Sequence, residues 1–428
     1  MINYNRLGYE IKRDFTNFMS KISQKLKRPQ QKFAHQMVYG ILAGNKLHLS
    51  EIARSLKEDI TLKKTIDRLS RNLNAFDEKE SVMQDYLSLV KQQVKEDYAV
   101  IVIDNSDIAK PASRKLEALS EIRDGSTGEI TQGYLTIEAA VLSESGKMPL
   151  PVYEKVFSAA EEGFVSETYE NLCCLQSLSE NFSPKCVRTL DRGFDANDYY
   201  RYFLKRGERF VIRAKKNRNV IYNGKTCNIM DVALKYKGAY RMDFKDKKGK
   251  CVQCKMSCMP VRLCEFPGKE LVLTVVHGFG EEPMLLLSNL KMQEKKKLCH
   301  IIAKVYLLRW RIEEYFKFKK QQFELEDLRV MSLQSIRSLN FFATLATGYI
   351  GLTSSVHRES IFLEELKECS KRIYEVPKFI FYALGYAIER VLSMSRTGIG
   401  GFLAKKVKSQ QLNLFEHFKI EDAGAFVF

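Results

Sequence analysis

Two short apolar runs, each followed directly by an aspartate, constrain the fold of this chain more than any other feature. The run AVIVI ends before Asp104, and the largely apolar run KCVRTL ends before Asp191. Runs of this kind are typical of strands that are buried on both faces of a sheet, with the acid emerging at the strand end. The sequence therefore predicts an α/β protein whose central sheet carries acids at the ends of two strands.

Changes in periodicity along the 428 residues predict five regions. Amphipathic helices come first, strands then alternate with helices, and a segment of period-two alternation follows. A long helix and several apolar helices complete the pattern. The predicted regions are 1–97 (N-terminal helices), 98–218 (first part of the core), 219–290 (β-rich insertion), 291–330 (helix that completes the core) and 331–428 (C-terminal helices).

The charge balance indicates a polyanionic partner. Lys and Arg number 69 against 52 Asp and Glu, which gives a net charge of +17. Such an excess favours nucleic acid or an anionic membrane surface, the alternative being a basic protein with neither partner. Polar residues interrupt the most apolar stretches, so these predict buried helices and no membrane span. The N-terminus shows no signal-peptide core, and ten cysteines without a regular framework predict a reducing cytoplasm.

A helix predicted at residues 305–320 carries polar side chains in line beside its apolar face. At about 100° per residue, four of them fall within an arc of about 60°. The neighbouring arc is the apolar stripe that a core-facing helix needs, so the polar line lies at the edge of the buried face. The apolar stripe consists of Val305, Leu308, Ile312, Phe316 and Phe323. The polar line consists of Tyr306, Arg309, Glu313 and Lys320.

Glu313 is a third acid that can converge with Asp104 and Asp191. Carboxylate oxygens suit Mg²⁺, which takes one or two of them and completes its shell with water and substrate phosphate. Such ions activate the nucleophile and stabilise the leaving oxygen in phosphoryl transfer. A lone Asp at a strand end is more often a turn or cap residue. Composition and spacing alone therefore predict a basic, metal-dependent phosphoryl-transfer protein and nothing narrower.

The polar line resembles the Y-R-E-K signature of bacterial insertion-sequence transposases, which are DDE enzymes with a ribonuclease-H-like core. Its four residues are separated by two, three and six residues, as in that signature. Asp104 in IDNSD resembles the first acid of the family, and Asp191 in LDRGFDAND resembles the second. Asp107 is a competing first acid, but Asp104 directly ends the apolar run. The resemblance implies a ribonuclease-H-like α/β core with a β-rich insertion, flanked by N-terminal and C-terminal helical regions.

The resemblance also implies an activity. The enzyme would bind the terminal inverted repeats of its own element, cleave strands there with Mg²⁺ (Mn²⁺ can substitute) and transfer them to target DNA. Two DNA ends must meet, so a homodimer on DNA is expected in a bacterial cytoplasm. The implied catalytic and metal-binding residues are Asp104, Asp191 and Glu313. The implied DNA contacts are Tyr306, Arg309 and Lys320.

Two further basic segments are candidate DNA contacts. RAKKNR, residues 213–218, follows a core strand and could line a DNA channel or be a solvated strand end. Residues 49–73 predict two helices with Ser50 and Thr61 as N-caps. They resemble a helix-turn-helix, although an ordinary hairpin explains the pattern equally well. The candidate side chains are Lys215, Lys216 and Arg218 in the first segment and Lys63, Lys64 and Arg68 in the second.

Two other functions stay open on the sequence alone. One is a metal-dependent nuclease or resolvase on the same core, which would cut branched DNA without joining ends. The other is a DNA-binding regulator derived from a transposase that no longer cuts. The intact acids and polar line favour catalysis, since a protein that does not cut has no chemical need for them.

Overall fold

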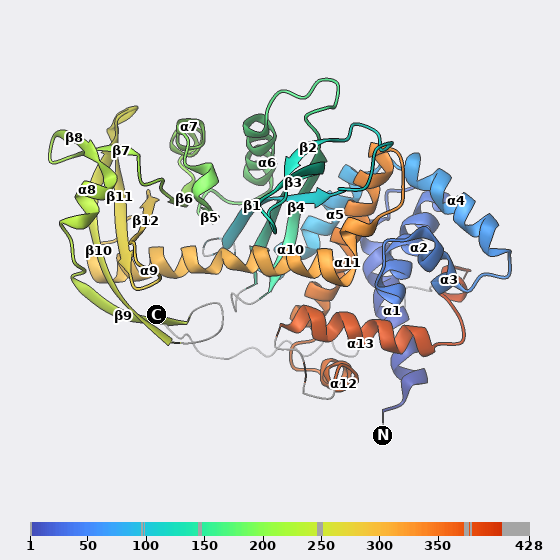
Figure 1. The fold of residues 1–428 in the computed structure, drawn as a ribbon. Coiled ribbons are helices and arrows are strands. Elements are labelled where there is room, and N and C mark those ends of the chain that lie inside the picture. The colour runs from blue at the N-terminus through green and yellow to red at the C-terminus, as the bar shows by residue number, and fades with distance from the viewer. Residues whose placement is uncertain are drawn as a thin grey trace.

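The computed structural model describes residues 2–404 except 96, 98, 144–147, 246–250, 372–375, 377 and 378. A mixed sheet runs through the molecule, with helices on both of its faces and a bundle of helices at one end (Figure 1). The predicted C-terminal segment 405–428 lies outside the described residues.

The centre of the sheet has the topology of a ribonuclease-H-like core, as predicted. One strand runs antiparallel to its two neighbours, and the other four strands share one direction. The apolar runs explain the two innermost strands, because Ile101–Ile103 and Val187–Leu190 are buried. The order across the core is β4 (Pro149–Phe157), β3 (Ile130–Leu142), β1 (Val100–Ala109), β5 (Val187–Leu190) and β6 (Arg209–Arg213). A short strand, β2 (Ser120–Arg123), also pairs with β3.

The strands between residues 219 and 290 continue this same sheet. β12 (Met284–Ser288) pairs antiparallel with β6 and carries the sheet onward to β11 (Phe266–His277). The remaining strands are β10 (Cys251–Leu263), β9 (Tyr240–Lys245), β7 (Asn219–Tyr222) and β8 (Lys225–Asn228). A short helix that the sequence analysis did not predict, α8 (Ile229–Leu234), begins where the side chain of Asn228 accepts a hydrogen bond from the backbone N–H of Met230, 2.8 Å away.

Helices cover both faces of the core sheet (Figure 1). α6 (Glu167–Asn181) and α7 (Asn197–Arg206) lie on one face, and α9 (Lys295–Leu308) and α10 (Trp310–Gln322) lie on the other. Alternate residues of β1 serve the two sides, since Ile101 and Ile103 belong to one buried cluster and Val102 to the other.

The helix predicted at 305–320 is two collinear helices, α9 and α10, that meet at Arg309. The predicted apolar stripe is only partly right. Ile312 is buried, but Leu308 and Phe316 are half-buried, and Tyr315 and Phe318 are fully buried in their place. The reason is that α10 packs against helices as well as the sheet: the ring of Phe318 contacts Phe381 of α13 (Ile380–Met394), and Lys319 reaches Asn340 of α11 (Leu333–Val356).

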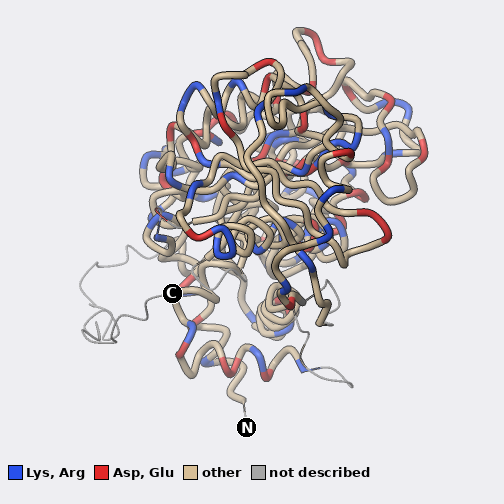
Figure 2. Tube along the Cα trace, turned by 90° about the vertical axis from the view of Figure 1, so that its left-hand side faces the viewer, with Lys and Arg blue, Asp and Glu red and all other residues tan. Residues whose placement is uncertain are grey.

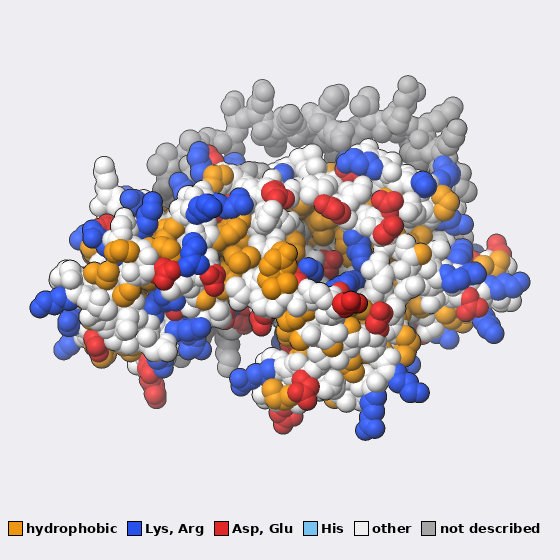
Figure 3. Space-filling view, turned by 90° about the horizontal axis from the view of Figure 1, so that it is seen from above, with side chains coloured by type: hydrophobic (Ala, Val, Ile, Leu, Met, Phe, Trp, Pro, Cys, Tyr) orange, Lys and Arg blue, Asp and Glu red, His pale blue; other side chains and the backbone are white. Residues whose placement is uncertain are grey.

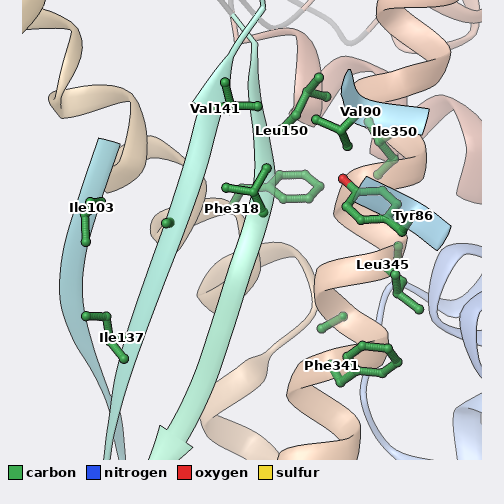
Figure 4. Packing of buried hydrophobic residues seen from close by; sticks show 14 of the residues in the cluster. Tyr86, Val90, Ile103, Ile137, Val141, Leu150, Phe318, Phe341, Leu345 and Ile350 are labelled. Atoms are coloured by element: carbon green, nitrogen blue, oxygen red, sulfur yellow. The ribbon is translucent and has the colours of Figure 1, made fainter. Parts of the chain in front are cut away.

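The N-terminal and C-terminal helices share one core. Phe15 packs on Tyr349 at 5.5 Å between ring centroids, and Phe33 packs on Phe342 at 5.5 Å. In Figure 4, Tyr86 and Val90 of α5 (Lys79–Lys91) lie beside Leu345 and Ile350 of α11, on the same side of the strands that carry Val141 and Leu150. The helices are α1 (Tyr4–Ile22), α2 (Arg28–Gly44), α3 (Leu49–Leu56), α4 (Leu62–Asn74), α5 (Lys79–Lys91), α11 (Leu333–Val356), α12 (Ile361–Cys369), α13 and α14 (Gly400–Ala404). No helix in the described part of the chain combines the length and apolar character needed to cross a membrane.

One of the two predicted N-caps is wrong. Thr61 occupies the N-cap position of α4, as expected. α3 instead begins with His48 at its N-cap, two residues before Ser50. The chain is fixed at this point because the backbone N–H of Leu47 donates to the carbonyl of Phe323 at 3.1 Å, so the helix starts earlier than the serine.

A buried polar cluster ties α10 to the sheet and to α11. Nζ of Lys319 lies 2.9 Å from both carboxylate oxygens of Glu138 on β3, and it also donates to Asn340 at 2.9 Å. The hydroxyl of Tyr315 donates to Glu138 at 2.5 Å. Glu138 pairs in register with Asp104 on β1, so this cluster fixes α10 beside the first candidate acid.

The second acid of the cluster, Glu154 on β4, predicts a pH-dependent stability. Burial raises the pKa of Glu154 from 4.5 to about 7, against the opposing charge of Lys319 and with added repulsion from Glu138. The folded state therefore favours the protonated carboxyl of Glu154. The stability that this gives is fully present below pH 4.5 and is lost as the pH rises through 7. We expect Glu154→Gln to be more stable than wild type at pH 8 by up to about 3 kcal/mol, with little difference at pH 4.5.

Urea unfolding of both proteins across this pH range measures the difference. Glu162→Gln, at an exposed position nearby, is the matched control and should follow wild type. A constant difference between Glu154→Gln and wild type at every pH would contradict the assignment.

Candidate active site

Two of the predicted acids lie side by side on adjacent parallel strands. Asp191 follows the end of β5, as predicted, but the prediction that the first strand ends before Asp104 is wrong, because pairing with β3 carries β1 on to Ala109. Ile103 of β1 pairs with Leu190 of β5, and Asp104 and Asp191 are the next residues of the two strands. Asp191 caps a short 3₁₀ helix, η2 (Arg192–Phe194), by accepting a hydrogen bond from the backbone N–H of Gly193 at 2.6 Å. This capping bond holds the second carboxylate in a fixed direction.

The junction of α9 and α10 brings the third acid to the same place. Nη1 of Arg309 lies 2.5 Å from Oδ2 of Asp104, and Nη2 of the same guanidinium lies 2.6 Å from Oε1 of Glu313. Arg309 and Glu313 are four residues apart, which sets them on one side of the helix. One guanidinium therefore bridges the first and third acids.

Burial and the neighbouring charges shift the pKa values of Asp104 and Arg309. Burial raises the pKa of Asp104 to about 7, and the neighbouring carboxylates of Asp191 and Glu313 add to this effect while Arg309 opposes it. Burial disfavours the charge of Arg309, but the carboxylates, Asp104 first, outweigh burial and raise its pKa above the usual value. Three carboxylates around one guanidinium leave an excess of negative charge.

These three acids supply the type of donor atom that a divalent cation needs, but in the described structure their ligand atoms do not all lie within 4.8 Å of one another. Carboxylate oxygens are hard ligands of the kind that Mg²⁺ and Mn²⁺ prefer, and a site with excess negative charge attracts a cation. The raised pKa of Asp104 shows the same repulsion among the acids, which a cation would relieve. Asp104, Asp191 and Glu313 are the residues that would hold it.

A basic hollow opens beside the second acid. Asp191 lines an open depression of about 600 Å³ together with Arg192, Lys215 and Lys216. A second hollow of about 310 Å³ shares Arg192 and Lys216 and adds Arg213 and Phe279, together with the acids Glu281 and Glu282. The arrangement places a cationic surface, with one aromatic ring, directly beside a candidate catalytic carboxylate.

Comparison with known proteins identifies the domain. Residues 173–348 match the family model described as a transposase DDE domain. The chain carries a transposase DDE domain. The match spans Asp191 and Glu313 and begins after Asp104. A domain of this kind marks the chain as a DNA-cutting and DNA-transferring enzyme, and the family implies the use of divalent metal ions.

Solved structures give only distant likenesses. The cryo-EM structure of a piggyBac transposase synaptic complex with hairpin DNA shares 10% identity at a TM-score of 0.45, over 96% of this chain and 82% of that chain. A crystal structure of Ciona intestinalis endonuclease V in complex with DNA shares 14% identity at a TM-score of 0.24, over 57% of this chain and 99% of that chain. Both are too distant to bear on function. A search of curated protein sequences finds no match.

The side chains of the basic segment after β6 have two different roles. Two lysines line the hollow, and one arginine holds the segment in place. The Lys215 side chain is exposed and lines the hollow, and Lys216 also lines it while pairing with Glu282. Nε of Arg218 instead lies 2.5 Å from Oδ1 of the buried Asp195. Asp195 also accepts from the backbone N–H of Lys215 at 2.6 Å. Arg218 thus fixes the segment that presents the two lysines.

The other two residues of the polar line, Lys320 and Tyr306, also have partners within the protein. Nζ of Lys320 lies 3.0 Å from Oδ2 of Asp107 and 2.9 Å from Oε1 of Glu326. Tyr306 is only 6% exposed, and its ring centroid lies 5.9 Å from the guanidinium carbon of Arg309. Asp107, the competing first acid, is thus engaged by Lys320, whereas Asp104 faces Arg309.

The remaining candidate DNA contacts lie on α4, at the end of the molecule away from the β10 side (Figure 1). Lys63 and Lys64 are exposed there. Arg68 forms an ion pair with Glu58 at 2.7 Å, which fixes the turn between α3 and α4. Basic residues are spread over the whole trace among acids (Figure 2), and they occur at both ends of the face seen in Figure 3.

The sequence analysis missed three features of this site. It left Arg192 and Arg213 out of the named side chains, although Arg192 follows Asp191 and Arg213 is the first residue of the basic segment 213–218. It singled out no aromatic residue in the insertion, where Phe279 stands between two glycines in the hairpin between β11 and β12. It also did not identify Lys319, whose only sequence signal is its position four residues after Tyr315.

A second group of possible metal ligands lies outside this site. Ligand atoms of His48, Glu324 and Asp327 lie within 4.8 Å of one another. Lys46 pairs with Glu324 at 3.1 Å, and Nη2 of Arg329 lies 3.4 Å from Oδ2 of Asp327. Both acids of this group thus already form ion pairs with cationic side chains. The group contributes no residue to the site around Asp104.

The close approach of Gly193 to Asp191 predicts a selective loss of activity. A Cβ at position 193 would lie 2.9 Å from Oδ1 of Asp191, the oxygen that accepts the capping bond. The carboxylate can turn away at little cost in stability, so Gly193→Ala should unfold as wild type does. We expect DNA cleavage to fall by about 10- to 100-fold, because small displacements of reacting groups have effects of this size.

A strand-cleavage assay and a thermal unfolding curve measure the two effects. Gly268→Ala is the control, since no atom lies within 4 Å of its added Cβ. Unchanged cleavage by Gly193→Ala would show that the orientation of Asp191 is unimportant.

Proposed function

We propose that this transposase binds the terminal inverted repeats of its own element, cleaves strands at those ends and joins the freed 3′-hydroxyls to target DNA, with Mg²⁺ as its cofactor. The observation that supports this most is the meeting of Asp104, Asp191 and Glu313 around one guanidinium, beside a hollow lined by basic side chains.

The three acids would hold the metal ion, which supplies Lewis-acid stabilisation of the attacking and leaving oxygens during phosphoryl transfer. Arg192, Lys215 and Lys216 offer donors and positive charge to the DNA backbone beside Asp191. Arg309 has a buried Nε without a hydrogen-bond partner, so its fork has a donor to spare for a phosphate oxygen.

The helices at the bundle end would hold the DNA away from the point of cutting. Lys63 and Lys64 on α4 are exposed and would contact the backbone of the terminal repeat. The enzyme would act as a homodimer on DNA, because two ends must be joined to one target.

Phe279 is proposed to stack on an unpaired base beside the cut. It lines the second hollow with Arg192 and Arg213, so a base on its ring would have its phosphate near positive charge. Stacking of one base contributes about 1–3 kcal/mol, so Phe279→Ala should lower the affinity for a DNA end by about 5- to 100-fold. Phe279→Trp should keep the affinity. Quenching of 2-aminopurine placed at the terminal bases measures the stacking, and equal quenching by Phe279→Ala and wild type would contradict this role.

Cleavage of a plasmid that carries the natural sequence flanking the gene tests the proposed function. We expect cuts at both flanks with Mg²⁺ or Mn²⁺, no cuts in EDTA, and joined products when target DNA is present. Cuts on branched DNA without joining would instead favour a nuclease or resolvase. Binding of the flanks without any cutting would favour a regulator and would overturn the proposal.

A further inference from the structure

The position of Arg309 is the feature that the proposed function does not explain. Its guanidinium bridges Asp104 and Glu313, with nitrogen–oxygen distances of 2.5 and 2.6 Å. These are two of the three acids that would hold the metal ion. A divalent cation of the Mg²⁺ type lies about 2.1 Å from each carboxylate oxygen, so it would need space that the guanidinium now fills.

The Arg309 guanidinium and a metal ion therefore cannot both bind these carboxylate oxygens at the same time. Their repulsion would be strong, because the Arg309 side chain is only 14% exposed and the Asp104 side chain only 17%. Arg309 must move before both carboxylates can bind a cation. Moving it breaks two charge-assisted hydrogen bonds, and this lowers the affinity of the free protein for metal.

Arg309 lies at the junction of two helices. It is the residue shared by the end of α9 and the start of α10. The backbone hydrogen bonds tighten there to a three-residue spacing, from Arg309 N–H to the Tyr306 carbonyl at 2.9 Å and from Ile312 N–H to the Arg309 carbonyl at 3.0 Å. Its Nε is buried and makes no hydrogen bond. A new anionic partner would satisfy that third donor.

A DNA phosphate is the partner of the right chemistry. Asp191, whose charge acts on Arg309, lines the basic hollow with Arg192 and Lys215. A phosphate drawn to those side chains would come close to the guanidinium and compete with the two carboxylates for it.

We propose that Arg309 is a gate between the two acids. In free protein it occupies the position of the metal ion, and a DNA phosphate draws it away, so that DNA and metal bind cooperatively and the free enzyme does not assemble a cutting site. This inference rests on the proposed function, because it takes Asp104 and Glu313 as metal ligands. By linkage, DNA must strengthen metal binding by the same factor by which metal strengthens DNA binding.

Binding of Mn²⁺ to the full chain, read from the electron paramagnetic resonance of free Mn²⁺, tests the gate without an activity assay. Wild type and Arg309→Met are titrated with and without a duplex oligonucleotide of random sequence, with the oligonucleotide alone as blank. We expect Arg309→Met to bind Mn²⁺ about 10-fold or more tightly without DNA, a typical size for coupling between two sites. DNA should strengthen Mn²⁺ binding to wild type by a similar factor and have little effect on the variant.

Arg311→Met is the matched control, because Arg311 is a half-buried arginine on the same helix whose nearby charge is Glu314. It should bind Mn²⁺ as wild type does. If Arg309→Met does not fold, Arg309→Gln keeps hydrogen bonds to the acids without the charge and should also bind Mn²⁺ more tightly. Unchanged or weaker Mn²⁺ binding by the Arg309 variant, or no effect of DNA on wild type, would overturn the gate.

Asp104→Asn and Glu313→Gln separate this failure from failure of the proposed function. Loss of Mn²⁺ binding in both variants, together with no effect at Arg309, would overturn the gate and leave the metal site standing. Unchanged Mn²⁺ binding in both would overturn the metal site and the gate together.

Discussion

Glu313→Gln is expected to reduce metal-dependent DNA cleavage on the order of 1,000-fold or more, because loss of one metal ligand removes several kcal/mol of transition-state stabilisation. Glu313 is half-buried at the edge of α10, and the replacement keeps its size and its ability to accept a hydrogen bond. Folding and DNA binding should therefore persist. Cleavage rates at saturating DNA, with a parallel filter-binding measurement, separate the two effects.

Glu314→Gln is the matched control for this prediction. Glu314 is the next residue of α10 and is also half-buried, but Arg309 contacts Glu313 and not Glu314. The control should cleave at the wild-type rate. Equal losses in both variants would mean that the helix tolerates no change here, and equal activity in both would remove Glu313 from the site.

Lys319→Met should lower the free energy of unfolding by about 3–5 kcal/mol, because it leaves a buried carboxylate without its counter-ion. Lys319 and Glu138 are each 1% exposed, and Nζ of Lys319 is the only cation within 4 Å of Glu138 among the described residues. The variant should also lose activity, because the cluster holds α10 against β3, where Glu138 pairs with Asp104.

Denaturant unfolding with Lys317→Met as control measures this effect. Lys317 is exposed on the same helix, so its replacement should leave stability nearly unchanged. Adding Glu138→Gln to Lys319→Met should restore much of the loss, since the buried charge is then gone while its hydrogen bonds can remain. A double variant as unstable as Lys319→Met alone would show that packing, and not the unpaired carboxylate, causes the loss.

The local elements that carry the candidate site were predictable from the sequence. The two apolar runs form buried strands, as predicted, and Asp191 follows the end of its strand. Asp104 instead lies within β1, because the pairing with β3 extends that strand to Ala109. The four-residue spacing of Arg309 and Glu313 likewise puts both on one side of a helix, and the structure joins them. These inferences depend only on local patterns, which can be read from a few consecutive residues.

Long-range pairing and the width of a buried face were not predictable in this way. The pairing of β12 with β6 makes the insertion part of the core sheet, and no local pattern encodes it. The sheet and the helices packed on α10 widen its buried arc, so Lys319 turns fully inward while the next residue, Lys320, pairs with the buried Asp107. The apolar stripe predicted from the sequence does not show which of these two adjacent lysines faces the core.

Cleavage of the polypeptide by bound iron tests the central claim, that Asp104, Asp191 and Glu313 form one metal site. Fe²⁺ replaces Mg²⁺ at carboxylate sites, and with ascorbate and peroxide it generates radicals that cut the nearest backbone. We predict fragments that end near residues 104, 191 and 313, suppressed by excess Mg²⁺ and absent in Asp104→Asn. Fragments near His48, Glu324 and Asp327 instead, or cuts that Asp104→Asn leaves unchanged, would contradict the account.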